Sequence, residues 1–201
     1  MNHPKIIGVC GLIGSGKSVV MRYFEHLGYP VYDCDTVAKA VYYDTDVRDE
    51  VTSLLGFDPI DGQGSLQKSR ISAAMADPLI KKALESIVHR AVLTDFDRWK
   101  SLHSDAEAVF MESAILFTSR FDTVCDLTIA VEAPIEVRRA RVLDRDGVGD
   151  PLRFDRIDAL QQDEALLIKG ATYHINNDNK CSVLRQLERI ASELTDKNTQ
   201  A

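Results

Sequence analysis

Eight residues near the start of the sequence have the types and spacing of a phosphate-binding loop. Gly11 to Ser18 read GLIGSGKS and match G-x-x-x-x-G-K-[ST] at every fixed position. Only glycine lets a backbone turn and approach a polyphosphate closely enough for its N–H groups to contact phosphate oxygens. Lys17 can reach the β- and γ-phosphates, and the Ser18 hydroxyl can ligate Mg²⁺. The pattern predicts a nucleoside triphosphate site, and the alternative is an ordinary glycine-rich turn.

Both flanks of this loop have the elements that such a site needs. Residues Lys5 to Cys10 are apolar and β-branched, which favours a buried strand, and apolar residues from Val19 to Leu27 recur at helical spacing. A helix that begins near Gly16 directs its positive end at the bound anion. The sequence therefore predicts strand, loop and helix in the order that a phosphate site requires.

Two carboxylates follow the next predicted strand, Pro30 to Tyr32. Asp33 and Asp35 would stand at the carboxyl end of this strand, where open α/β sheets place their ligands. Either could accept a proton from an attacking hydroxyl or hold Mg²⁺ through water. Aspartate is also a good helix N-cap, so we expect one of the two to serve only that purpose. The spacing alone does not say which.

A cluster of arginines forms the third group of candidate residues. In the helix predicted after the fourth strand, Arg138, Arg141 and Arg145 fall on one face. The planar guanidinium suits phosphate. The glycine-containing segment from Asp146 to Pro151 follows, and a second helix is expected near Pro151. This layout is typical of a lid that closes over phosphates, and the alternative is a basic, solvated helix face.

Composition and charge narrow the class of protein. The chain has 201 residues, 45% of them hydrophobic and 27% charged, with a formal charge of −7 and a pI near 5.2. This acidic balance disfavours binding to nucleic acid or an anionic membrane. No apolar run approaches the roughly 20 residues needed to span a bilayer. The four cysteines show no C-x-x-C pairing, and the first strand begins too early for a signal peptide, so we expect free thiols and a cytoplasmic location. A monomer is plausible, although the sequence does not specify the oligomeric state.

Strand-like and helical segments alternate along the chain. This order predicts an α/β doubly wound fold with a five-stranded parallel sheet, in a single domain that spans residues 1–201. An all-helical insertion of about residues 36–106 could cap an acceptor site, and the lid occupies about residues 138–165. The strands are expected at Lys5–Cys10, Pro30–Tyr32, Ala108–Met111, Asp126–Val131 and Tyr173–Ile175.

The assembled pattern resembles the dephospho-coenzyme A kinase family, whose members are small phosphate-loop (P-loop) kinases. The loop Gly11 to Ser18 is followed by Asp33-Cys34-Asp35, similar to the family's G-x-x-G-S-G-K-S and D-x-D motifs. The helix that ends in Arg145-Asp146 is similar to the family's lid, and Ile175-Asn176-Asn177 is close to its late I-D-N segment. The resemblance covers nearly the whole chain and implies a fold of the P-loop kinase type.

The family transfers the γ-phosphoryl group of ATP to the ribose 3′-hydroxyl of dephospho-coenzyme A, the last step of coenzyme A biosynthesis. By position, the resemblance implies that Asp35 is the general base and that Lys17 holds the phosphates. Arg145 would stabilise charge during transfer, and Asn177 would lie near the adenine. Mg²⁺ is the implied metal, with Ser18 as its ligand. The nucleotide-binding residues implied are Gly11, Ile13, Gly14, Ser15, Gly16, Lys17, Ser18, Val19, Arg141 and Asn177.

Several positions depart from the family's pattern. His89-Arg90 stands where the family has His-Pro, Asn176 replaces an aspartate, and Ala114 to Thr118 (AILFT) replaces P-L-L-[FV]-E. These changes concern the acceptor more than the nucleotide. Two alternatives therefore stay open: another small nucleoside or nucleotide kinase, and an ATP-binding protein with little transfer activity. No [NT]-K-x-D signature occurs, which argues against a GTPase.

Overall fold

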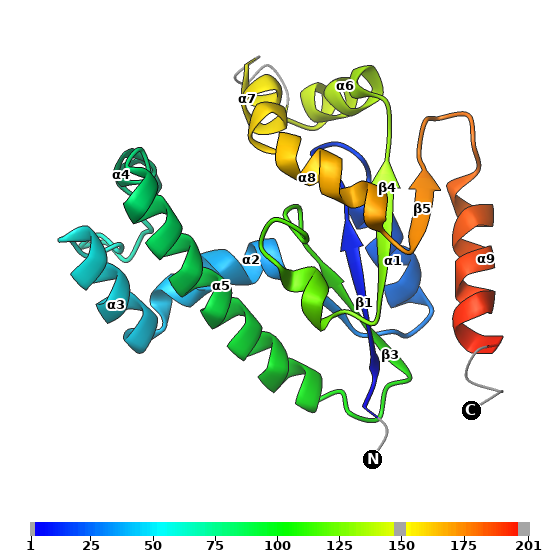
Figure 1. Cartoon of the computed structure of the whole chain (residues 1–201), viewed down its shortest axis with the longest axis horizontal. Helices are drawn as coiled ribbons and strands as arrows, with labels where there is room; N and C mark the ends of the chain where they lie inside the picture. The colour runs from blue at the N-terminus through cyan, green and yellow to red at the C-terminus, as the bar shows by residue number, and fades with distance from the viewer. Residues whose placement is uncertain (1–2, 147–151, 197–201) are drawn as a thin grey trace. The chain divides into compact units, whose positions relative to one another are not determined.

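The chain divides into two compact units (Figure 1). The structure, a computed structural model, describes residues 3–146 and 152–196. One unit contains the chain up to Tyr32 and again from His103 onward, and we call it the sheet unit. The other is the continuous segment Asp33–Leu102, which we call the helical unit. The two are described separately below.

A five-stranded sheet organises the sheet unit. Its strands are β1 (Lys5–Cys10), β2 (Val31–Asp33), β3 (Ala108–Glu112), β4 (Leu127–Glu132) and β5 (Tyr173–Asn176), in the order β2-β3-β1-β4-β5. The ladders of β1 with β3, β1 with β4, and β4 with β5 are parallel. The predicted α/β fold with a five-stranded parallel sheet is confirmed. The central position of β1 places the loop that follows it at the carboxyl edge of the sheet.

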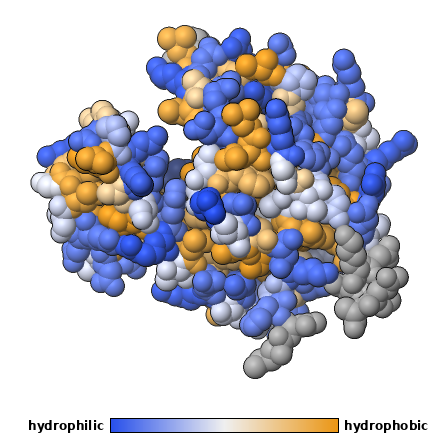
Figure 2. Space-filling view, viewed as in Figure 1, coloured by the Kyte–Doolittle hydropathy of each residue, from blue (hydrophilic) through white to orange (hydrophobic). Residues whose placement is uncertain are grey.

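The outer surface mixes hydrophobic and hydrophilic side chains, as Figure 2 shows for one face. Several leucines of the later helices are exposed, among them Leu160 at 78% and Leu166 at 65%. None of the described helices combines the length and the hydrophobicity that crossing a bilayer requires. All four cysteines are free, as expected from their spacing, and Cys10 and Cys34 are buried.

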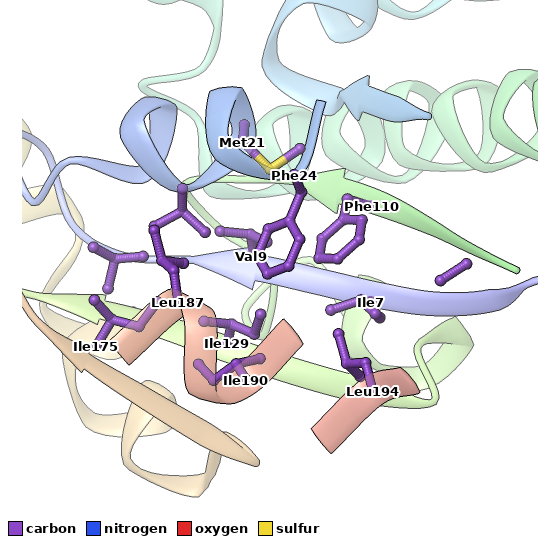
Figure 3. Close-up of a cluster of buried hydrophobic side chains, with 13 residues drawn as sticks. Ile7, Val9, Met21, Phe24, Phe110, Ile129, Ile175, Leu187, Ile190 and Leu194 are labelled. Atoms are coloured by element: carbon purple, nitrogen blue, oxygen red, sulfur yellow. The ribbon is translucent and has the colours of Figure 1, made fainter. Parts of the chain in front are cut away.

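The main core lies on one face of the sheet (Figure 3). Ile7 and Val9 of β1 point to this face because alternate residues of a strand share a side. Two helices cover it: α1 (Lys17–His26) and α9 (Val183–Asp196). Each helix contributes one apolar stripe, and Phe24 of α1 stacks on Phe110 of β3 with ring centroids 4.0 Å apart. The stripes consist of Val20, Met21 and Phe24 on α1 and Leu187, Ile190 and Leu194 on α9.

The segment between β3 and β4, including the short helix η2 (Phe121–Val124), packs on the opposite face of β1. A Cβ atom at Gly8 would lie 2.8 Å from both Cys125 Sγ and a methyl carbon of Leu116, so this close approach requires glycine. After β4 come α6 (Ile135–Asp146), α7 (Arg153–Leu160), α8 (Gln162–Leu167) and η3 (Ile168–Gly170). The described part of the predicted lid segment therefore contains residues of three α-helices, whereas the predicted glycine-containing segment after Asp146 lies outside the described residues.

The helical unit consists of α2 (Cys34–Ala40), η1 (Val41–Tyr43), α3 (Thr45–Leu55), α4 (Lys68–Ala74) and α5 (Pro78–Ser101). The start of α5 has a clear local cause, since the Asp77 side chain accepts a hydrogen bond from Leu79 N–H and Pro78 occupies the first turn. The sequence analysis did not predict α4. It has only seven residues, too few for a clear apolar stripe.

Candidate active site

The phosphate loop connects the end of β1 at Cys10 to the start of α1 at Lys17. Its three glycines have backbone φ angles in the left-handed region: 150° at Gly11, 77° at Gly14 and 102° at Gly16. Neighbouring segments press against each glycine, so no larger side chain would fit. A Cβ atom would lie 2.4 Å from Val131 O at Gly11, 2.5 Å from Arg138 O at Gly14 and 2.3 Å from Asn177 Nδ2 at Gly16.

Lys17 reaches across this loop. Its ammonium group donates a hydrogen bond to Gly11 O at 2.9 Å, so the charge is held at the loop. Ser18 follows in the first turn of α1 with an exposed side chain. The N-terminus of α1 adds its unpaired N–H groups and the positive end of the helix dipole. The loop, the lysine and the helix end together can bind a polyphosphate.

Arg141 and Asn177, both predicted nucleotide-binding residues, lie together beside the loop. Asn177 Nδ2 donates to Ser15 O at 2.8 Å, and Arg141 Nη2 donates to Asn177 Oδ1 and Asn177 O, both at 3.0 Å. Arg141 Nη2 also donates to Asn179 Oδ1 at 2.5 Å. The structure thus brings α6 and the segment after β5 to the same point of the loop.

Arg138 does not share the predicted role of the other arginines. Its side chain is buried, with 6% of the residue exposed, and Nη1 donates to Asp158 Oδ1 at 2.7 Å. The same nitrogen donates to Ile13 O at 3.3 Å, and Nε donates to Ala133 O at 3.2 Å. These bonds hold the guanidinium within the protein, so the interpretation of Arg138 as a phosphate-facing lid residue is wrong. Arg145, in the last turn of α6, has an exposed side chain.

Two buried residues of the lid segment were missed by sequence reasoning. Gln161 accepts a hydrogen bond from Ile13 N–H at 2.8 Å and donates through Nε2 to Ala114 O at 3.4 Å. Glu164, 1% exposed, accepts bonds from Phe117 N–H at 3.1 Å and from Thr118 N–H and Oγ1–H at 2.9 and 3.0 Å. One signal was available, because Gln161 and Glu164 share the inward helical face with Ile168, where apolar residues are expected.

The two aspartates of the D-x-D motif lie in the helical unit and differ in their contacts. β2 ends at Asp33, and Asp35 is in the first turn of α2, so Asp35 is helical and does not belong to the strand end as expected. Asp33 is the N-cap of α2: its carboxylate accepts bonds from Thr36 N–H at 3.0 Å and Thr36 Oγ1–H at 2.6 Å. Asp35 is half-buried. The expectation that one aspartate caps a helix is confirmed for Asp33.

A groove of about 440 Å³ lies among α2, α3 and α5 of the helical unit. Its walls include the apolar side chains of Val37, Val41 and Ile87, and also Glu50 and Arg90, which form an ion pair at 2.5 Å. Arg90 is one of the departures from the family pattern, and here it is fixed to a carboxylate of the neighbouring helix. A groove of this size and mixed polarity suits a small molecule with both aliphatic and polar groups.

Two thiols of the sheet unit, Cys10 and Cys125, have raised pKa values. Burial raises the pKa of the Cys10 thiol far above its usual range, and burial together with Asp122 raises the pKa of Cys125 to about 12. Both side chains act as small apolar groups whose S–H is a weak hydrogen-bond donor. The Cys10 thiol, for example, donates to Ile129 O at an Sγ–O distance of 3.6 Å. Neither thiol has the lowered pKa that is typical of a reactive cysteine.

Comparison with protein families decides the assignment. The family model described as dephospho-CoA kinase matches residues 5–182. The chain belongs to the dephospho-CoA kinase family. A dephospho-CoA kinase from Porphyromonas gingivalis is 36% identical over 186 residues, 92% of this chain and 91% of the relative. One from Bacteroides fragilis is 34% identical over 187 residues, with the same coverage. The chain is therefore an ATP-dependent kinase.

Solved structures agree with the fold. A crystal structure from Thermus thermophilus aligns with a TM-score of 0.80 at 30% identity and covers 98% of both chains. A dephospho-CoA kinase from Campylobacter jejuni gives a TM-score of 0.66 at 18% identity, covering 96% of this chain and 98% of the other. A shikimate kinase from Bacteroides thetaiotaomicron gives 0.55 at 16%, covering 95% and 98%. The last two likenesses show that the fold is shared with P-loop kinases of different substrates.

Proposed function

We propose that this dephospho-CoA kinase family member transfers the γ-phosphoryl group of ATP to the ribose 3′-hydroxyl of dephospho-coenzyme A. This is the last step of coenzyme A biosynthesis. The observation that carries the proposal is the intact phosphate loop, with Lys17 across it and Arg141 and Asn177 packed at Gly16, in a chain that matches the family over residues 5–182. Phosphoryl transfer needs alignment and charge stabilisation more than covalent chemistry, and these residues supply both.

The nucleotide side of the proposal follows from the sheet unit. The loop N–H groups and the N-terminus of α1 bind the phosphates, and Lys17 exchanges its bond with Gly11 O for phosphate oxygens. Arg141 and Asn177, which contact the loop at Ser15, are the proposed residues on the nucleoside side of the ATP site. The hard oxygen of the exposed Ser18 hydroxyl fits Mg²⁺ and would hold it. The bound ion would neutralise charge between the β- and γ-phosphates.

Asp35 is the proposed general base. The neighbouring Asp33 is the helix cap, with both carboxylate oxygens bonded to Thr36, and Asp35 is the position that corresponds to the second aspartate of the family's D-x-D motif. In the transfer, the 3′-oxygen forms a bond to the γ-phosphorus, the bond to the β,γ-bridging oxygen of ATP breaks, and the hydroxyl proton passes to the Asp35 carboxylate. Arg145, exposed at the end of α6, is the proposed cation that stabilises the charge on the transferred group.

The helical unit is the proposed acceptor-binding part of the chain. Its groove among α2, α3 and α5 offers aliphatic walls and paired charges. The arm that distinguishes dephospho-coenzyme A from a nucleotide is an aliphatic chain with amide groups. The aliphatic walls can pack against the chain, and the charged side chains can hydrogen-bond to the amides. The groove begins on α2 at Val37, two residues after Asp35. We therefore assign the groove to this arm.

A coupled assay of ADP release tests the function. The purified chain is mixed with ATP, Mg²⁺ and either dephospho-coenzyme A, a nucleoside or a nucleoside monophosphate, and the product is identified by mass spectrometry and by the ³¹P signal of a 3′-phosphate. We expect turnover with dephospho-coenzyme A and its loss in Lys17→Ala. A higher kcat/KM for a nucleoside would make the chain a nucleoside kinase. ATP binding without turnover on any acceptor would make it a binding protein.

A further inference from the structure

We infer that Gln161 is a positioning residue for the phosphate loop, which fixes the loop tip at Ile13 in the shape that receives the triphosphate. The inference concerns ATP binding by the loop and does not depend on the acceptor. Gln161 lies 148 residues after Ile13, between α7 and α8, and only 6% of it is exposed. It belongs to the predicted lid segment, but no local pattern in the sequence indicates that its partner is Ile13.

The backbone of Ile13 is bound on both sides by buried side chains of the lid segment. Its N–H donates to Gln161 Oε1 at 2.8 Å, and its carbonyl accepts from Arg138 Nη1 at 3.3 Å. The other end of the Gln161 amide donates to Ala114 O, just after β3. Gln161 therefore links the loop tip to the edge of the sheet, and Arg138 links it to α6.

The loop needs such support because its own sequence provides little stiffness. Ile13 is followed by Gly14, whose φ is 77°, and Gly11 precedes it by two residues at a φ of 150°. Glycine has the largest conformational freedom in the unbound chain, so a loop of this kind loses entropy when its N–H groups are aligned on a phosphate. A contact that orders the loop before the nucleotide arrives removes part of this cost and tightens binding.

The supporting side chains are themselves fixed. Arg138 is paired with the buried carboxylate of Asp158 at 2.7 Å and donates to Ala133 O. Asp158 is three residues before Gln161, and the N–H of Gln161 donates to Asp158 O. The two contacts to Ile13 are thus connected through one short stretch at the end of α7. We call Arg138, Asp158 and Gln161 the loop brace.

The residue type at position 161 is specific to this geometry. An amide presents one acceptor and one donor at the same end of the side chain, which matches an N–H on Ile13 and a carbonyl on Ala114. A glutamate would keep the bond to Ile13 and lose the donor. A methionine of similar length would lose both bonds while filling the same buried space.

The test uses Gln161→Met with Gln162→Met as its matched control. Gln162 is the next residue, and its amide donates to Asp158 O and Oδ2 and not to the loop tip. ATP affinity is measured by calorimetry without acceptor, and hydrogen exchange is measured on the peptide that contains Ile13. We expect Gln161→Met to weaken ATP binding about five- to tenfold, the effect of losing the one hydrogen bond to the loop, and to speed hydrogen exchange at Ile13. Gln162→Met should change the affinity less than about twofold.

Gln161→Glu provides a second reading if the methionine variant folds poorly, because it retains the acceptor for Ile13 N–H. We expect it to keep Ile13 protected from exchange and to lose less ATP affinity than Gln161→Met. The inference is overturned if Gln161→Met binds ATP as tightly as the unchanged chain, or if exchange rises equally throughout the sheet unit. If the chain binds ATP in this Gln161-dependent way but does not phosphorylate dephospho-coenzyme A, the proposed function is wrong and the role of the loop brace is still supported.

Discussion

Asp33 and Asp35 are two residues apart and have the same side chain, but their backbone positions give them different roles. The strand ends at Asp33 with φ −100° and ψ 100°, the extended conformation of an N-cap, so its oxygens bind the first turn of α2. Asp35 is the second residue of α2 and lies within its first turn. Its carboxylate is the one proposed to accept the proton of the attacking hydroxyl.

Asp35→Asn should separate binding from chemistry. Without a proton acceptor we expect kcat to fall about 10²-fold or more, while the Kd for ATP stays within about twofold because Asp35 is not part of the phosphate loop. Asp33→Asn is the matched control, since asparagine caps a helix nearly as well as aspartate. Equal losses of kcat in the two variants, or full turnover in Asp35→Asn, would remove Asp35 from the role of base.

A pair of glycines tests how the loop packs against Asn177. Gly16 and Gly28 have φ angles of 102° and 91°, so an alanine at either position pays a similar backbone strain, about 1–2 kcal/mol. Only at Gly16 would the new methyl group meet Asn177 Nδ2, at 2.3 Å, whereas Gly28 has open space within 4 Å. We expect Gly16→Ala to lose most ATP affinity in calorimetry and Gly28→Ala to keep it. Similar affinities in both variants would show that the Asn177 contact is unimportant for ATP.

Among the elements, α8 buries a carboxylate on its inward face. Its residue Glu164 is almost fully buried and accepts three hydrogen bonds from Phe117 and Thr118, in the segment where the family usually carries a glutamate of its own at position 118. A buried carboxylate bound by several donors holds α8 to this segment.

Replacing Glu164 by glutamine should loosen that attachment. The amide keeps one acceptor but turns an NH₂ group toward backbone donors, so we expect the free energy of unfolding to fall by about 1–3 kcal/mol in denaturant titrations. Asp163→Asn is the control, because Asp163 is the exposed acidic neighbour on the same helix and should change stability by less than about 0.5 kcal/mol. An unchanged midpoint for Glu164→Gln would mean that the carboxylate contributes nothing to the packing of α8.

Elements with a clear local signal could be predicted from the sequence, and long-range polar contacts could not. The strands and the loop each depend on neighbouring residues, and the predicted bounds of the strands agree with the structure within about two residues. Gln161 and Glu164 lie on an inward helical face, which periodicity can indicate. Their partners, Ile13 and Thr118, are 148 and 46 residues away, and no local rule names them. Arg138 was misread for the same reason, because Asp158 neutralises it.

At the scale of the whole molecule, the chain separates into a nucleotide part and a helical part. Every residue of the loop brace and every contact of Lys17, Arg141 and Asn177 reported above belongs to the sheet unit, whereas the groove and Asp35 belong to the helical unit. Substitutions in the groove should therefore act on the acceptor alone.

Ala91→Trp tests this division. Ala91 lines the groove on α5, and an indole there would occupy space proposed for the aliphatic arm. We expect the KM for dephospho-coenzyme A to rise at least about fivefold while the KM for ATP is unchanged. Leu79→Trp adds the same ring at a 79% exposed position on the same helix and should alter neither KM. A parallel rise of both KM values for Ala91→Trp would contradict the assignment of the groove.

The register of β1 sets when the nucleotide site can exist during synthesis. β1 pairs with β3 at Lys5↔Ala108 and with β4 at Ile7↔Leu127, so both of its neighbours are encoded more than 100 residues downstream. A nascent chain that has emerged as far as Leu102 holds the complete helical unit but has neither strand to support β1. The phosphate loop therefore lacks the two strands that flank β1 until the chain has been made beyond β4.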